Sequence, residues 1–273
     1  MKFTKSFILI LALALLAVPI AAQTNAVNNS TSCSLATLNG SYGVLEQGTF
    51  LAQLPGSPPP PFLAVNSAIA TYDGAGHVSG TNTASFGGVI VPGTFTGTYT
   101  VNSDCTYSME FTALPLGVVL HETGTITGRG MFQEIHLIYK DPFLVASGTA
   151  KKMPPGGCSQ ETLKGRYTVF GQGLATLPGL PPLLPGAHVG IFAADGSGHF
   201  AGEDTITIAG MAGPDTFTAK YTVNPDCTMT AAITTSVGVL NEVGTITGMG
   251  RFQESRKIIV EPGWVLADTD KKQ

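Results

Sequence analysis

Two related stretches place acidic and basic side chains where they could bind a ligand or move a proton. In "HETGTITGRGMFQEIH" (residues 121–136), a hairpin that turns at Arg129 makes Glu122 face His136 on the neighbouring strand. Glu134 then lies diagonally from Glu122 on the same side of the hairpin. Two carboxylates and a basic partner in a concave site can orient a polar ligand group or act in general acid–base chemistry.

The stretch "NEVGTITGMGRFQESR" (residues 241–256) repeats this arrangement. With a turn at Met249, Glu242 faces Arg256, and Glu254 lies on the same side. The other side of the second strand is polar and is predicted to face water, so the side with Glu254 and Arg256 is predicted to point inward. An alternative is a structural ion pair near an open end of the fold, where water lowers the cost of burying charge. The side assigned to water carries Arg251, Gln253, Ser255 and Lys257, and the candidate ligand-binding residues are Glu122, Glu134, His136, Glu242, Glu254 and Arg256.

The two stretches belong to a duplication that covers most of the chain. "YTVNSDCT" (residues 99–106) recurs as "YTVNPDCT" (residues 221–228) with seven of eight residues identical, and "GTITGRGMFQE" recurs as "GTITGMGRFQE" with nine of eleven identical. Each unit is about 110–120 residues long, which is an ordinary size for one domain. The sequence therefore predicts two domains, at residues 33–150 and 158–268, joined by a Pro/Gly-rich linker at residues 151–157.

Each unit contains two cysteines at matching positions. An even number of cysteines in an exported chain favours disulfides. Of the three possible pairings, Cys33–Cys105 with Cys158–Cys227 is predicted, because each unit can then fold alone. Each bridge would close a loop of roughly 70 residues and contribute up to roughly 4 kcal/mol on the chain-entropy model.

The sequence predicts neither a metal site nor a cofactor. No C-x-x-C motif is present, and "HETGT" lacks the second histidine of a zinc-protease helix motif. The stretches "GAGHVSG" and "GSGHFAG" lead into strands rather than helices, so they lack the helix N-terminus that holds phosphate in a glycine-rich loop. These glycines are predicted to form turns.

The N-terminus has the layout of a secretory signal peptide, with cleavage predicted after Ala22. Lys2 and Lys5 precede a twelve-residue apolar run, and small residues follow it. Removing residues 1–22 leaves 12 basic against 18 acidic residues, a net charge near −6. This mildly acidic composition lacks the excess of basic residues that is typical of nucleic-acid-binding domains. No other apolar run is long enough to span a membrane, so a secreted or periplasmic protein is predicted.

The pattern of each unit is all-β. Runs rich in Thr, Val, Ile, Tyr and Phe alternate with glycine turns at short intervals, and helical periodicity is absent outside the signal peptide. Sequential hairpins favour an up-and-down meander, and about eight strands can close into an antiparallel β-barrel. Two tandem barrels are predicted, with two-sheet β-sandwiches as the alternative. The strands predicted in the first unit are 38–47, 63–72, 77–86, 94–101, 106–113, 118–127, 131–139 and 143–150.

The duplicated pattern CS-x-x-TL-x-G-x-Y … YTVN-x-DCT resembles that of a group of exported bacterial proteins of uncharacterised function. At the level of architecture the units resemble calycin-type barrels, which include lipocalins, avidins and the allene oxide cyclase barrel. "LNGSYG" and "LKGRYT" stand where lipocalins place a Gly-x-Trp, with tyrosine replacing the tryptophan. Fold analogy alone does not assign a function.

Three functions from different classes follow as hypotheses. The first is binding of a small, largely apolar ligand in one or both barrels, oriented by the inward glutamate and its basic partner. The second is a barrel enzyme of the cyclase or isomerase type, in which Glu122 or Glu134 polarises or deprotonates a substrate. The third is a structural or adhesive cell-envelope protein. Binding is favoured over catalysis, and no catalytic residue is assigned.

Overall fold

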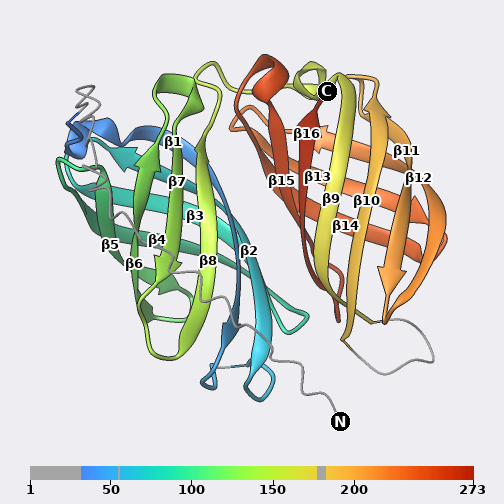
Figure 1. Ribbon diagram of the computed structural model, residues 1–273, viewed down its shortest axis with the longest axis horizontal. Coiled ribbons are helices and arrows are strands. Elements are labelled where there is room, and N and C mark those ends of the chain that lie inside the picture. The colour runs from blue at the N-terminus through green and yellow to red at the C-terminus, as the bar shows by residue number, and fades with distance from the viewer. Residues whose placement is uncertain (1–31, 55, 177–182) are drawn as a thin grey trace, which may run out of the picture. The chain divides into compact units, whose positions relative to one another are not determined.

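A computed structural model describes residues 32–54, 56–176 and 183–273 of the chain. It is all-β and contains two closed barrels, each of eight antiparallel strands (Figure 1). The predicted up-and-down barrels are confirmed, and the sandwich alternative is wrong. The predicted signal peptide lies outside the described residues.

Barrel one is an up-and-down meander in which every strand pairs with the next. It closes where the first strand pairs with the eighth, for example through Tyr42 and Lys152. The predicted strands are all present, and their predicted ends lie within a few residues of the observed ends. The strands are β1 (Asn39–Phe50), β2 (Phe62–Asp73), β3 (His77–Phe86), β4 (Val89–Val101), β5 (Thr106–Leu114), β6 (Val118–Thr127), β7 (Glu134–Tyr139) and β8 (Leu144–Lys152).

Barrel two repeats this topology and closes between its first and last strands, where Tyr167 pairs with Lys272. Its strands are β9 (Gly165–Ala175), β10 (Leu184–Ala194), β11 (His199–Ile208), β12 (Met211–Val223), β13 (Thr228–Thr235), β14 (Gly238–Thr247), β15 (Glu254–Ile259) and β16 (Val265–Lys272). The described helices are short 3-10 turns: η1 (Leu35–Thr37), η2 (Gly130–Phe132), η3 (Gln160–Leu163) and η4 (Gly250–Phe252). None of these described helices has the length and apolarity that a membrane crossing requires.

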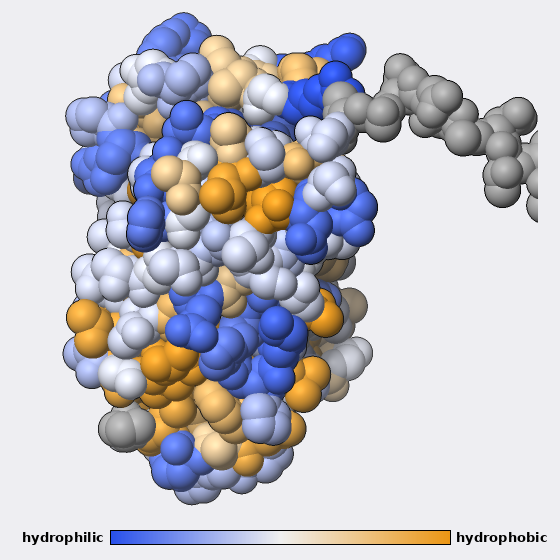
Figure 2. Space-filling view, turned by 90° about the vertical axis from the view of Figure 1, so that its left-hand side faces the viewer, coloured by the Kyte–Doolittle hydropathy of each residue, from blue (hydrophilic) through white to orange (hydrophobic). Residues whose placement is uncertain are grey.

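Alternation along each strand builds the two cores. In β5, Tyr107, Met109 and Phe111 are buried inside barrel one, whereas Glu110 between them is exposed. The face of the molecule in Figure 2, at the end of Figure 1 that carries barrel one, accordingly mixes hydrophilic and hydrophobic side chains. The inward side chains of the strands therefore form the cores, and the side chains between them point outward.

Each barrel is closed at one end by its own N-terminal segment and a disulfide. In barrel one, the hydroxyl of Tyr99 donates to the carbonyl oxygens of Leu35 and Leu38 and so holds η1 over this end. The predicted bridges Cys33–Cys105 and Cys158–Cys227 are both present. Two disulfides indicate an oxidising location, extracellular or periplasmic.

The register of the β6–β7 hairpin differs from the prediction. Residues 128–133 form a wide turn that contains η2, so that Thr127 pairs with Glu134. Glu122 consequently faces Tyr139 rather than His136. The predicted tight turn at Arg129 is wrong because the chain spends three residues on a 3-10 turn before β7 begins.

The equivalent turn in barrel two has the same effect. Here η4 lies between β14 and β15, so Glu242 faces Ile259, and Arg256 faces Thr245. The register is shifted by an odd number of residues from the prediction. An odd shift moves every side chain of the second strand to the opposite face.

Candidate ligand-binding site

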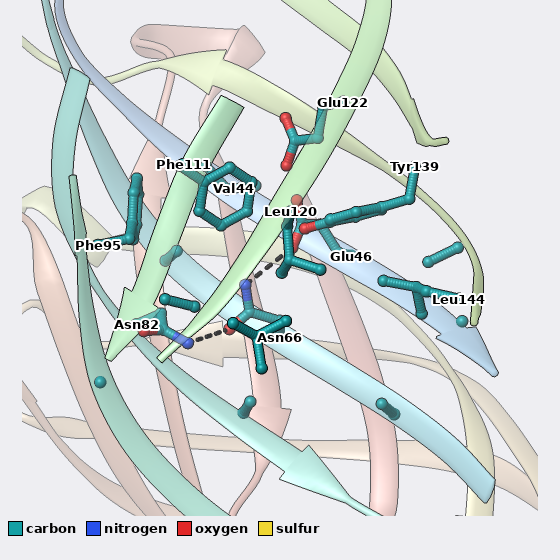
Figure 3. A pocket seen from close by; sticks show the side chains of 18 of the residues that line it. Val44, Glu46, Asn66, Asn82, Phe95, Phe111, Leu120, Glu122, Tyr139 and Leu144 are labelled. Carbon is teal, nitrogen blue, oxygen red and sulfur yellow. Dashed lines mark hydrogen bonds between the residues drawn. The ribbon is translucent and has the colours of Figure 1, made fainter. Parts of the chain in front are cut away.

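Barrel one encloses a cavity of about 100 Å³ (Figure 3). This space holds several water molecules or a small ligand, because one water needs roughly 10–15 Å³ measured in this way. The cavity lies toward the end of the barrel where the connections β1–β2 and β5–β6 contribute Leu54 and Leu116 to its lining and β8 begins with Leu144. Its other walls are largely apolar and include Val44, Phe50, Ala68, Ala84, Phe95, Phe111, Leu120 and Leu137.

Two carboxyl groups interrupt this apolar lining. Glu46 comes from β1 and Glu122 from β6, and their exposed fractions are only 6% and 2%. The hydroxyl of Tyr107 donates to Oε2 of Glu122 at 2.5 Å, and the amide of Asn66 donates to Oε2 of Glu46 at 2.8 Å. The amide of Asn82 donates in turn to Oδ1 of Asn66 at 3.0 Å, which fixes the orientation of that side chain (Figure 3).

Burial raises the pKa of both carboxyl groups. The pKa of Glu122 lies well above its usual value, first because burial penalises its charge and then because Glu46 is close. Burial also raises the pKa of Glu46, against the opposing effect of hydrogen bonds from Asn66 and Tyr139. The close approach of the two carboxyl groups also has opposite effects on them, because it raises the pKa of Glu122 and lowers that of Glu46. Of the two groups, Glu122 therefore holds its proton more firmly than Glu46.

This arrangement suits recognition of a polar group on an otherwise apolar molecule. The carboxyl pair offers hydrogen-bond acceptors inside an apolar enclosure. No lysine, arginine or histidine lines this cavity in the part of the chain that the structure describes. The charge of Arg256 of barrel two lowers the pKa of Glu46, but this is the smallest of the effects on that group.

Barrel two has a smaller cavity, of about 80 Å³, and an ionic network beside it. The ammonium group of Lys257 lies 2.8 Å from Oε2 of Glu242 and 3.0 Å from Oδ2 of Asp270. All three side chains are almost completely buried. Burial lowers the pKa of Lys257, but the charges of Asp270 and Glu242 outweigh this effect and raise it above its usual value. Burial raises the pKa of Glu242 to about 8.

His188 belongs to the same polar layer. Its Nδ1 lies 3.0 Å from Oδ2 of Asp204, and its Nε2 lies 3.0 Å from Oδ1 of Asp268. Burial lowers the pKa of His188, but the two carboxylates more than compensate and raise it to about 10. Barrel two therefore contains two cations paired with carboxylates, whereas the cavity of barrel one contains carboxyl groups alone.

The structure places only two of the six predicted site residues inside the barrels, Glu122 and Glu242. In barrel one, Glu134 and His136 lie on the outer face, and His136 has an exposed side-chain fraction of 54%. The predicted inward orientation of these two residues is wrong, because the 3-10 turn moves them to the outer face. Glu134 instead lies 3.5 Å from the ammonium group of Lys151.

Glu254 and Arg256 are also on the outer face, although both are buried. The outer side of β15 packs against barrel one, where Arg256 donates to the carbonyl oxygens of Gly43 and Thr149 at 2.9 and 2.8 Å. Glu254 accepts from Lys151 at 2.8 Å. Their predicted position inside the barrel is wrong, and a contact between the repeats, rather than a cavity, explains their burial.

Sequence reasoning missed Glu46 and Lys257. Glu46 follows Tyr42 and Val44 at intervals of two residues, so alternation alone could have placed it inside. The charge of Lys257 predicts that it faces water, and only the nearby carboxylates of β14 and β16 explain its burial.

No family model matches this chain, and no curated protein resembles it significantly in sequence. Among the described residues, no group of three or more His, Cys, Asp or Glu side chains is arranged to hold a metal ion.

Proposed function

We propose that this chain is an exported protein that binds a small, largely apolar ligand inside barrel one. Glu46 and Glu122 receive the polar group of the ligand, and the apolar walls receive its body. A closed eight-stranded barrel is wide enough to hold one small ligand, as lipocalins and streptavidin do. Export is supported by the sequence pattern of residues 1–22 and by the two disulfides.

The observation that carries this proposal is the carboxyl pair in the apolar cavity of barrel one. Burying two acidic groups without a cation among the cavity-lining residues costs stability, and such groups are frequent at functional sites. Barrel two lacks this feature, because Lys257 and His188 already pair with its inner carboxylates. The sequence predicts ligand binding in one or both barrels, and the proposal concerns barrel one alone.

Native mass spectrometry of the mature chain, purified from its own host, tests the proposal. A small molecule should accompany the folded protein and be released on denaturation. Glu122→Gln should reduce its occupancy, and so should Ala84→Ile, which introduces into the cavity wall the residue that barrel two has at the equivalent position, Ile206.

Glu203→Gln is the matched control, because Glu203 is an exposed glutamate of β11. This variant should carry the molecule as the parent does. A folded chain with both disulfides and no bound molecule, which also fails to take up small apolar compounds added to it, would contradict the proposal and support the structural hypothesis.

A further inference from the structure

The two repeats allow the polar layers of the barrels to be compared position by position. The "GTITG" match sets an offset of 120 residues, which makes Glu122 equivalent to Glu242 and Leu137 equivalent to Lys257. In barrel two, Glu242 binds the ammonium group of Lys257 at 2.8 Å. The glutamate retained by both repeats therefore binds an ammonium group in one of them.

Barrel one lacks both cations of this layer. Leu137 replaces Lys257 and is buried in the cavity wall. Asn66 replaces His188 at an offset of 122 residues, which the matched Asp73 and Asp195 turns establish.

Barrel one nevertheless has a second inner carboxylate, that of Glu46. Glu46 is equivalent to Gly171, where a side chain would collide with the network, since an added Cβ would lie 2.2 Å from Nε2 of His188. Conversely, Asp268 of barrel two is equivalent to Gly148, where an added Cβ would lie 2.5 Å from Cγ of Glu46. The second inner carboxylate thus lies on β1 in barrel one and on β16 in barrel two, and barrel one lacks the cation that pairs with it in barrel two.

We propose that the ligand of barrel one is a primary amine with a small apolar body. Its ammonium group lies between Glu46 and Glu122, in the role that Lys257 has in barrel two, and its body extends toward Leu116 and Leu144. This inference rests on the proposed function of barrel one and adds the chemical class of the ligand. Binding releases to solvent the proton that the carboxyl pair holds, so that an ammonium ion replaces a proton between the two groups.

The size of the cavity limits the apolar body. A dry cavity of roughly 150 Å³ holds benzene, and the cavity of barrel one is about 100 Å³. A body of roughly four to six carbons fits such a volume. n-Hexylamine is therefore a suitable probe, and 1-hexanol is the matched neutral probe of the same length.

Isothermal titration calorimetry of the mature, disulfide-bonded chain with these two probes at pH 7 tests the inference. We expect n-hexylamine to bind roughly ten to a hundred times more tightly than 1-hexanol, as for a hydrogen bond to a charged group. Glu122→Gln should remove most of this preference while 1-hexanol still binds, and Glu203→Gln should leave both affinities unchanged.

Leu137→Lys provides a second test, because it supplies barrel one with the tethered ammonium group of barrel two. This variant should lose n-hexylamine binding and keep the circular dichroism spectrum of the parent. If Leu137→Lys does not fold, the affinities of Glu122→Gln for the two probes test the amine assignment instead. A preference for n-hexylamine as strong as that of the parent would then contradict it.

The two proposals fail differently in these titrations. Equal or tighter binding of 1-hexanol in the parent overturns the amine assignment and leaves the binding function standing. Binding of neither probe, together with no molecule in the native mass spectrum, overturns both proposals.

Discussion

Glu122 shows how one buried residue can link stability to pH. Its carboxyl group is held by Tyr107, lies beside Glu46 and has a pKa well above its usual 4.5 because of burial. The native state therefore keeps a proton that the unfolded chain releases. The free energy of unfolding then falls as pH rises above about 4.5, by at most about 1.4 kcal/mol per pH unit for one proton.

We expect Glu122→Gln to weaken this dependence on pH. An amide cannot ionise, so the variant should become more stable relative to the parent as pH increases from 5 to 8. Urea unfolding across this range measures the difference. The other titratable groups around Glu122 are Glu46, whose raised pKa acts in the same direction, and Tyr72, Tyr107 and Tyr139, whose raised pKa values keep them neutral. A difference that stays constant with pH would show that Glu122 ionises as an exposed carboxyl does.

At the scale of single residues, the sequence predicted part of the site. Glu122 and Glu242 each lie two residues after a leucine and four residues before an isoleucine of the same strand face, so their inward orientation could be predicted. Lys257 could not be placed, because a buried lysine is tolerated only where carboxylates from other strands meet it. Contacts between distant segments of this kind leave no local pattern in a sequence.

At the scale of elements, strands were easier to predict than the turns between them. Alternating β-branched and aromatic residues fix a strand, whereas "GRGMFQ" is compatible with either a tight hairpin or a wide 3-10 turn. The wide turn uses Gly128 at φ 68°, where an added Cβ would lie 2.1 Å from the carbonyl oxygen of Phe132. This choice of turn decides which face of β7 points inward, and it moved Glu134 and His136 out of the site.

The disulfide of barrel one is an element whose removal has a predictable cost. It links Cys33, beside η1, to Cys105 in the turn before β5, across 72 residues of sequence. We expect Cys33→Ala/Cys105→Ala to lose up to about 4 kcal/mol of stability, mainly because the unfolded chain gains freedom. Equilibrium unfolding in urea measures the loss.

A second double variant separates the effect of the disulfide on stability from the effect of the backbone conformation at Cys105. Cys105 has φ 67°, a left-handed conformation that glycine adopts more easily than alanine. Cys33→Ala/Cys105→Gly should therefore be at least as stable as the alanine pair, although it lacks the same bridge. Unchanged stability in both double variants would mean that the bridge does not stabilise barrel one.

At the scale of the whole molecule, the two barrels differ in the charges of their inner layer. Barrel one has an apolar cavity whose carboxyl pair has no cation among the lining residues, whereas barrel two fills the same layer with paired charges. Each barrel also has its own closed sheet, its own core and its own disulfide. A change to the ionic network should therefore affect barrel two first.

Lys257→Leu tests this division, because it gives barrel two the residue that barrel one has at Leu137. The substitution leaves Glu242 and Asp270 buried without their cation, which should cost about 3–5 kcal/mol. The loss should be smaller at acidic pH, where both carboxyl groups can be protonated. Hydrogen exchange followed by mass spectrometry should show lost protection in β13–β16 and retained protection in β5–β8. Equal loss in both barrels would show instead that contacts such as those of Arg256 make the repeats unfold as one cooperative unit.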